Sequence, residues 1–299
     1  MGKDEEKKAA RRKKLYIRGC VTNGLGLTIL FAIAKGLDLY TYAGIALGLQ
    51  YAVFFLHGMP FNSEKFYDLS GSLTHFSVVA SSMYLNYDGK AHPVKLFASI
   101  VSFIWMIRLG SFLYARILKD KKDERFDHIK TVWWSFMGAW TLQADWVLII
   151  QLPAVLLNTS ELYSETLNTY QYVAMAGWVV GFLIEVLADS QKSAFRKIPE
   201  NRHKYITSGL WRYSRHPNYF GEIVMHSSLG ALASISGGLY FALLSPVFTW
   251  FLLLKVSGVP MLEKAGMKKW GGDPVYVNYM TNTSCIIPWF PAGDLKKEK

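Results

Sequence analysis

The sequence is poor in cysteine and in charge. Its 299 residues include two cysteines, Cys20 and Cys285, and 18% of the residues are charged whereas 51% are hydrophobic. Two cysteines so far apart predict neither a disulfide framework nor a cysteine-based metal cluster, and we expect no metal. A soluble domain carries nearer a quarter charged residues. The shortage of charge therefore favours a membrane protein.

Acidic residues are scarcer than basic ones. The chain has 22 Asp or Glu against 33 Lys or Arg, which gives a formal net charge of +11. This excess does not indicate nucleic-acid binding, because the basic residues of membrane proteins gather on the cytoplasmic side. We therefore expect membrane lipids as surroundings and no nucleic acid as a partner.

The first 18 residues contain no apolar run. They hold eight Lys or Arg and three acids. A secretory signal peptide needs a short apolar core and a small-residue cleavage site, so this segment is not one. It is typical of a mobile, basic cytosolic tail.

Apolar runs recur after the tail, and most approach the about 20 helical residues that cross a bilayer. The predicted fold class is therefore all-α, a polytopic membrane bundle of about eight transmembrane helices, with seven as the alternative. The third and seventh runs are short or polar. The predicted spans are 19–37, 39–60, 69–85, 94–118, 133–157, 171–189, 219–237 and 239–258.

The distribution of basic residues predicts the orientation. With eight spans and the N-terminus in the cytosol, the cytosolic segments hold 29 of the 33 basic residues. The connections 116–132 and 190–217 are the richest. A seven-span chain would place Lys264, Lys268 and Lys269 on the opposite side, which we disfavour. Both termini are thus predicted to be cytosolic.

Two short motifs agree with this topology. Asn158-Thr159-Ser160 is an N-glycosylation sequon on the side predicted to be lumenal. The chain ends Lys296-Lys297-Glu298-Lys299, which is similar to a dilysine retrieval signal and predicts the endoplasmic reticulum. Chance is the alternative for both motifs.

Ionisable residues inside apolar segments are costly and are candidates for function. Glu185 and Asp189 lie four residues apart, as do Glu222 and His226, so each pair shares a helix face. The alternative is a buried ion pair that fixes packing, which suits Arg108 with Asp145.

The connection before the seventh span is the most polar part of the chain. Its residues 208–222 include Arg212, Arg215 and His216, and Pro217 suits the first turn of the following helix. The unpaired amides of that turn and two bidentate guanidinium groups predict an anion site, for example for phosphate. A membrane-interface loop is the alternative. A second polar and aromatic group follows at Glu263, Tyr276 and Tyr279.

These residues carry a resemblance to a known group. The run Ser214-Arg215-His216-Pro217-Asn218-Tyr219-Phe220-Gly221-Glu222 resembles the signature of the steroid 5-alpha-reductase superfamily, and more closely its branch of small integral membrane proteins. Further similar segments fall in order across residues 60–291. They are 105–109 with Arg116, 123–127, 143–153, 185–195, 257–263 and the Tyr276/Tyr279 pair.

The resemblance implies an NADPH pocket that faces the cytosol. Lined up by motif position, it would be formed by Asp189, Arg196, Tyr213, Arg215, His216, Asn218, Tyr219, Glu222, Tyr276 and Tyr279. The sequence has no GxGxxG after a strand, so membrane helices rather than a Rossmann domain must hold the cofactor. Steroid reductases usually have Asn where Glu185 stands and Trp near His226.

The resemblance also implies a tyrosine, supported by a carboxylate, that polarises the substrate carbonyl. The candidates for this catalytic pair are Tyr67 and Glu64, with Asp68 beside them. The alternative is that Phe66 and Tyr67 are interface anchors.

The resemblance divides the chain into functional segments. Residues 1–18 form the basic tail, 19–299 form one membrane domain, 19–118 are its divergent, substrate-side half and 119–291 its cofactor-binding half, and 292–299 form a cytosolic tail.

Three functions remain open at this point. The first is an NADPH-dependent reductase of a carbon–carbon double bond in a steroid, sterol or other lipid. The second is a membrane methyltransferase that uses S-adenosylmethionine, since such enzymes share the Arg-His-Pro-x-Tyr element. The third is a non-catalytic subunit of a membrane assembly.

Overall fold

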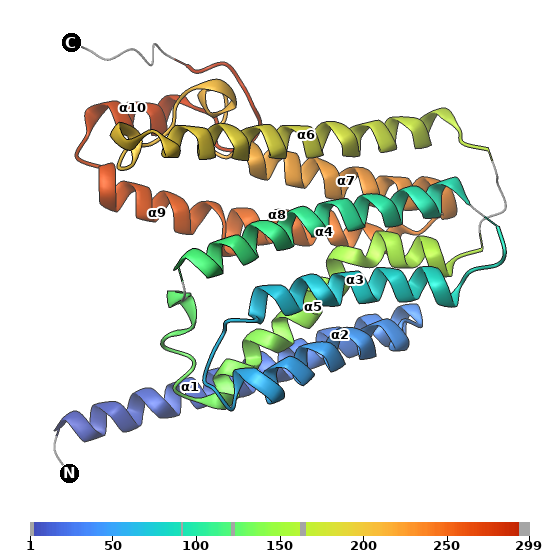
Figure 1. Cartoon of the computed structure of the whole chain (residues 1–299), viewed down its shortest axis with the longest axis horizontal. Coiled ribbons are helices and arrows are strands. Elements are labelled where there is room, and N and C mark those ends of the chain that lie inside the picture. The colour runs from blue at the N-terminus through green and yellow to red at the C-terminus, as the bar shows by residue number, and fades with distance from the viewer. Residues whose placement is uncertain (1–2, 91, 121–122, 162–165, 293–299) are drawn as a thin grey trace. The chain divides into compact units, whose positions relative to one another are not determined.

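A computed structural model describes residues 3–90, 92–120, 123–161 and 166–292. Throughout these ranges the regular elements are helices and none is a strand, which confirms the predicted all-α class. The chain divides into two compact units, Met1–Glu165 (unit 1) and Thr166–Lys299 (unit 2), and each is described by itself (Figure 1). The division of the membrane domain into a substrate-side half and a cofactor-binding half, between residues 118 and 119, is implied by the resemblance and stays a prediction.

Unit 1 is built around one helix, α5 (Trp133–Thr159), which is apolar on nearly all sides and is buried along most of its length. A helix of this kind must be surrounded by other helices. It contacts α1 (Lys3–Leu37), α2 (Tyr40–Val53), α3 (Tyr67–Leu85) and α4 (Pro93–Asp120). Two short helical turns complete the unit, at Phe54–Gly58 and Glu124–Phe126.

The basic N-terminal segment is helical. Residues 3–18, predicted as a mobile tail, instead form the first half of the continuous helix α1. The physical reason is local: the segment consists mostly of Ala, Lys, Arg and Glu, which are strong helix formers. Its acids, Asp4, Glu5 and Glu6, lie in the first turn, where they stabilise the positive end of the helix dipole.

Polar side chains in unit 1 close contacts between its helices. Gln50 Nε2 donates to Thr74 Oγ1 at 2.8 Å and joins α2 to α3. Asn158 Nδ2 on α5 donates to Ser82 Oγ at 2.9 Å and to Ser99 Oγ at 3.0 Å, and so joins α5 to α3 and α4. Such bonds between helices are a usual source of cohesion in membrane bundles.

The glycosylation expected at Asn158 does not fit this fold. The side chain is 3% exposed, and its amide nitrogen is engaged by two serines. An acceptor asparagine must lie on the surface. The sequon prediction is therefore wrong for the folded chain, because position 158 belongs to the buried end of α5.

Unit 2 begins with the long antiparallel helices α6 (Thr169–Lys197) and α7 (Pro217–Gly237), which lie side by side (Figure 1). Two glycines allow their close approach: a Cβ on Gly221 would lie 2.5 Å from the carbonyl oxygen of Gly181. Small residues at such crossings let helix backbones touch. The chain continues through a 3₁₀ turn (Tyr240–Leu243), α8 (Leu244–Phe251), a π-helical turn (Leu252–Val256), α9 (Val259–Trp270) and α10 (Pro274–Asn282).

The ends of α6 and α7 follow from sequence signals. Asn168 and Gln171 form a capping box at the start of α6, each side chain bonding the other's backbone amide. Pro217 begins α7, where a missing amide proton costs nothing. Gly238, with φ of 66°, ends α7 in the left-handed conformation that favours glycine.

Every predicted span coincides with helical structure. Five stretches among the described residues are long and apolar enough to cross a membrane, namely Asp4–Leu37, Pro93–Ala115, Trp133–Thr159, Thr169–Lys197 and Tyr240–Trp270. Helices α2, α3 and α7 do not reach that standard, because α2 is short and the other two carry many polar residues. The chain is thus a membrane-type helical protein, and the count of eight stays a prediction.

Candidate functional site

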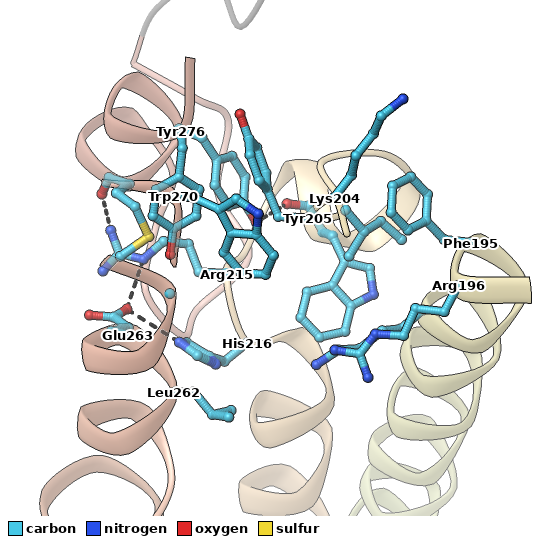
Figure 2. A pocket seen from close by; sticks show the side chains of 16 residues that line it. Phe195, Arg196, Lys204, Tyr205, Arg215, His216, Leu262, Glu263, Trp270 and Tyr276 are labelled. Carbon is cyan, nitrogen blue, oxygen red and sulfur yellow. Dashed lines mark hydrogen bonds and ion pairs between the residues drawn. The ribbon is translucent and has the colours of Figure 1, made fainter. Parts of the chain in front are cut away.

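An open pocket lies in unit 2 at the C-terminal end of α6. Its empty volume, which includes the open mouth, is about 710 Å³. Its walls come from α6, the connection to α7, the start of α7, α9 and α10 (Figure 2). The lining residues are Lys192, Phe195, Arg196, Lys204, Tyr205, Ile206, Trp211, Arg215, His216, Leu262, Glu263, Gly266, Trp270, Tyr276, Tyr279 and Met280.

The connection between α6 and α7 is fixed to the end of α6. Trp211 Nε1 donates to the carbonyl oxygen of Ala188 at 3.0 Å, and the Lys192 ammonium lies 4.6 Å from the centre of the Trp211 ring. Gly209 has φ of +62°, and a Cβ there would collide with the Gln191 side chain, which accepts from Leu210 N. Glycine is therefore required at this turn.

A second set of bonds fixes the start of α7 to the segment after α10. The backbone amide of Arg215 donates to the carbonyl oxygen of Ser284 at 2.8 Å. Ser214 Oγ donates to the carbonyl oxygen of Ile286 at 2.8 Å and accepts from His216 N at 3.1 Å. The Ser-Arg-His run before Pro217 is thus held rigidly from both sides.

Glu263 on α9 joins two residues of this run. Its Oε1 lies 3.0 Å from Arg215 Nε and 3.2 Å from His216 Nε2 (Figure 2). A guanidinium nitrogen of Arg215 also donates to the carbonyl oxygen of Met280. Arg215 is therefore already charge-paired within the protein, and Glu263 places both Arg215 and His216.

The same carboxylate belongs to a group with metal-ligand chemistry. Ligand-type atoms of His216, Glu263 and Cys285 lie within 4.8 Å of one another. Such N, O and S atoms can bind Zn²⁺. A divalent cation would compete here with the Arg215 guanidinium for Glu263 Oε1, so we interpret Glu263 as the counter-ion of Arg215.

Aromatic rings form one wall of the pocket. Tyr205 contacts Trp270, Tyr276 and Tyr279, with ring centroids 5.6, 4.7 and 6.3 Å apart. Tyr279 Oη donates to the carbonyl oxygen of Trp211 at 2.7 Å. Burial raises the pKa of Tyr205, Tyr276 and Tyr279, so these phenols stay neutral and can donate hydrogen bonds at physiological pH.

Gly266 makes room for one of these phenols. A Cβ at this position would overlap the hydroxyl of Tyr276. Any larger residue would therefore push Tyr276 out of its place in the wall.

Five of the ten residues predicted for the cofactor line this pocket. They are Arg196, Arg215, His216, Tyr276 and Tyr279. The other five, Asp189, Tyr213, Asn218, Tyr219 and Glu222, are not among its lining residues.

Four of those five stand near one another on α6 and α7. Asn218 Nδ2 donates to Asp189 Oδ1 at 3.2 Å and links the two helices. The Tyr219 ring stacks on the His216 ring, with centroids 5.4 Å apart and planes 7° from parallel. The carboxylates of Asp189 and Glu222 act electrostatically on the Tyr219 phenol. Of these residues, Tyr219 contacts His216 directly.

Tyr213 has a different place. Its ring packs edge-on against Phe290 at 5.8 Å, and its carbonyl oxygen accepts from Trp289 N at 2.9 Å. It therefore holds the segment after α10.

The two predicted catalytic residues lie in unit 1. Glu64 is 6% exposed; its Oε2 lies 2.6 Å from Lys130 Nζ, and its Oε1 accepts from Asp123 N at 3.0 Å. Tyr67 Oη donates to the carbonyl oxygen of Ala139 at 3.0 Å, and burial raises the pKa of this phenol. Each side chain thus has a structural partner.

Several lining residues were not predicted from the sequence. They are Lys192, Lys204, Tyr205, Trp211, Trp270 and Met280. The first four lie in or beside the polar connection 190–217, whose basic and aromatic content was the available signal. Trp270 and Met280 had no such signal, because the fold of α9 and α10 brings them to the pocket.

These observations define a class of protein. It is a helical, membrane-type protein with a polar and aromatic pocket at one end of a pair of helices. The chain belongs to the DUF1295 family, described as "Protein of unknown function", whose model matches residues 54–283. That match includes both the unit 1 residues predicted to be catalytic and most of the pocket.

One curated relative has a name that suggests a reaction. The chain is 30% identical over 125 residues to "Probable O-methyltransferase ustE" of Ustilaginoidea virens. The similarity covers 39% of this chain and 43% of that protein, less than half of each. No solved structure gives a significant match.

Proposed function

We propose that the protein is a membrane-embedded, NADPH-dependent reductase of a carbon–carbon double bond in a steroid, sterol or other lipid. The observation that carries this proposal is the charge of the pocket. Four cationic side chains line it, Lys192, Arg196, Lys204 and Arg215, and Glu263 is the one carboxylate among its lining residues. Such a lining suits a ligand with several phosphates.

The residues present fit NADPH group by group. No described residue pairs with the Arg196 guanidinium, which points into the pocket in Figure 2. It is therefore available to a phosphate, and we assign it the phosphate that NADPH has and NADH lacks. Lys192 and Lys204 add point charges, and Glu263 holds Arg215 and His216 in the wall. When bound, NADPH supplies a hydride.

The aromatic wall suits the rings of a dinucleotide. Tyr205 and Trp270 are partly exposed lining residues whose rings can stack on a planar base. The phenols remain neutral, because burial raises their pKa, so they add no charge that would repel phosphate. The hydroxyls of Tyr205 and Tyr279 already donate within the protein, to Asp273 Oδ2 at 2.9 Å and to the carbonyl oxygen of Trp211 at 2.7 Å.

Reduction of an enone also needs a donor that polarises the carbonyl oxygen, where negative charge develops. We assign this role to Tyr67, with Glu64 as its supporting carboxylate. To act, the Tyr67 hydroxyl must turn from the carbonyl oxygen of Ala139 to the substrate. The Glu64–Lys130 pair meanwhile keeps the segment before α3 in place.

The substrate follows from the surroundings. Membrane-type helices on the chain imply a lipid or steroid-like molecule that enters from the bilayer. The basic residues of the connections 116–132 and 190–217 suit an orientation with these connections in the cytosol.

A methyltransferase is the second candidate, and the name of the curated relative favours it. S-adenosylmethionine carries a sulfonium and an ammonium group, which seek carboxylates. The pocket offers one carboxylate, Glu263, and this is already paired with Arg215. The cationic lining therefore favours the phosphorylated dinucleotide.

The deciding experiment compares ligands on the purified full-length protein in detergent. Calorimetry measures the affinities of NADPH, NADH and S-adenosylmethionine. We expect NADPH to bind at least about tenfold more tightly than NADH, because a guanidinium–phosphate bond contributes on the order of 1.5–3 kcal/mol.

Each other result identifies another function. Tight S-adenosylmethionine binding without NADPH binding would establish the methyltransferase instead. NADPH binding with no oxidation of the cofactor by any enone lipid would point to the non-catalytic subunit. Equal affinities for NADPH and NADH would contradict the role given to Arg196.

A further inference from the structure

One face of α1 changes character along the helix. Val21, Leu25 and Ile29 are 53%, 60% and 45% exposed, and at about 100° per residue they fall on one side. The same side continues toward the N-terminus as four exposed basic residues with spacings of four, three and four. This cationic stripe consists of Lys7, Arg11, Lys14 and Arg18.

The stripe does not face the helix bundle. The buried side of α1 carries Gly19, where a Cβ would lie 2.8 Å from Ser135 N, and Asn23, whose Nδ2 donates to the carbonyl oxygen of Trp134 at 2.9 Å. Gly19 and Asn23 lie roughly 110° and roughly 150° around the helix from the centre of the stripe. The stripe therefore extends the apolar face that unit 1 turns toward lipid.

Aromatic residues mark the membrane interface at this end of unit 1. Tyr16 is 54% exposed and Trp133 is 49% exposed, and Trp134 Nε1 contacts Cys20 Sγ at 3.1 Å, which sets the start of α5 level with this part of α1. Exposed Tyr and Trp gather at the headgroup level of membrane proteins.

From that level the reach of the charges can be calculated. At 1.5 Å per residue, Lys14, Arg11 and Lys7 stand about 3, 8 and 14 Å beyond Tyr16 if the helix is upright. The headgroup layer is about 6 Å thick and the Debye length is about 8 Å at physiological salt. All three charges therefore act on the headgroups of the adjoining leaflet, and Arg18 reaches them by extending its side chain.

We propose that Lys7, Arg11, Lys14 and Arg18 form a binding surface for anionic lipid headgroups of the leaflet around this end of α1. Clusters of four to eight basic residues beside a membrane span have the charge that such lipids recognise. This surface is independent of the pocket in unit 2 and of the reaction proposed for it.

The test uses two triple variants of the full-length protein. One removes three charges from the stripe, Lys7→Gln, Arg11→Gln and Lys14→Gln. The matched control removes three from the other sides of the same helix, Lys8→Gln, Arg12→Gln and Lys13→Gln. Each protein is purified in micelles that contain equal amounts of phosphatidylserine and phosphatidylcholine, and mass spectrometry measures the lipids that it retains.

We expect the unchanged protein to retain phosphatidylserine at least about threefold over phosphatidylcholine, and to lose this preference in 0.5 M salt. The stripe variant should lose most of the preference, whereas the control should keep most of it. Equal retention of the two lipids by the unchanged protein would overturn the proposal. So would equal losses in both variants, since the effect would then come from net charge. Thermal unfolding curves confirm that both variants are folded.

Discussion

The two units use polar residues in opposite ways. In unit 1 the two residues predicted to be catalytic are bonded to other parts of the bundle: Glu64 is bound by Lys130 at 2.6 Å, and the Tyr67 hydroxyl donates to a backbone carbonyl at 3.0 Å. In unit 2 they gather at helix ends and connections, where they surround an open space. A polar group that closes a contact stabilises the fold, whereas one that lines a space is available to a ligand. Substitutions in the first unit should therefore change stability and those in the second should change binding.

The largest effect expected is on the stability of unit 1. Lys130→Ala would leave the buried Glu64 carboxylate without its ammonium partner, and breaking such a pair costs about 3 kcal/mol of unfolding free energy. Chemical or thermal unfolding in detergent measures the loss. Lys65→Ala, which removes the exposed lysine next to Glu64, is the control and should change little. NADPH affinity should stay the same in the folded protein. A normal unfolding curve for Lys130→Ala would show that the pair does not stabilise the fold.

The next largest effect concerns binding by unit 2. Arg196→Ala should weaken NADPH binding by about 1.5–3 kcal/mol, because a charge-assisted bond to phosphate is lost, and it should leave NADH binding and the unfolding temperature nearly unchanged. Arg212→Ala removes an exposed arginine of the same connection that does not line the pocket, and it should bind NADPH normally. Equal losses in the two variants would mean that net charge rather than Arg196 is recognised.

A substitution of Tyr67 tests whether a polar residue of unit 1 has a role in the reaction as well as in stability. Tyr67→Phe removes one hydrogen bond to Ala139 and should lower the free energy of unfolding by about 1 kcal/mol. If the phenol also polarises the substrate, turnover should fall by about 10²-fold or more while NADPH affinity is kept. Unfolding and single-turnover measurements on the same preparation separate the two roles. Unchanged turnover would leave Tyr67 with a structural role alone.

The smallest effect is a difference between the two cysteines, one in each unit. Cys20 is exposed, whereas Cys285 is half-buried beside Glu263, and burial raises the pKa of its thiol. The thiolate is the reactive form, so Cys285 should be alkylated several-fold more slowly than free cysteine at pH 8 and should speed up as pH rises past the usual value of about 8.5. Bound NADPH should slow the alkylation of Cys285 and leave the alkylation rate of Cys20 unchanged. Mass spectrometry of each cysteine after timed alkylation measures this, and identical slowing of both by NADPH would mean that the effect is not local.

The sequence predicts the positions of the helices well. Several apolar runs are bounded by a residue that starts or ends a helix, such as Asn168 before α6, Pro217 before α7 and Gly238 after it. These signals are local and can be found without tertiary information. The helix over residues 3–18 is an exception, because it has no apolar run and rests on helix propensity alone, while the cytosolic position of this segment stays a prediction.

The site is predictable only where it is contiguous in sequence. The run from Ser214 to Glu222 led to Arg215 and His216, which do line the pocket. Glu263 contacts His216, which is 47 positions away in the sequence. Trp270 reaches the aromatic wall of the pocket because α9 and α10 fold back. No periodicity or spacing gives such contacts. Residues of the same run also point elsewhere: Asn218 bonds Asp189 rather than the pocket.

The bonds between the start of α7 and the segment after α10 determine when the site can form during synthesis. Arg215 and Ser214 are held by carbonyl oxygens of Ser284 and Ile286, and Tyr213 by the amide of Trp289. Chains fold from the N-terminus as they leave the ribosome. Helices α6 and α7 can therefore pair early, but the run 213–215, which carries Arg215 of the pocket, is not held in place until residues 284–289 have emerged. A newly made chain should acquire its ligand as the last step of its maturation, after its helices are in the membrane.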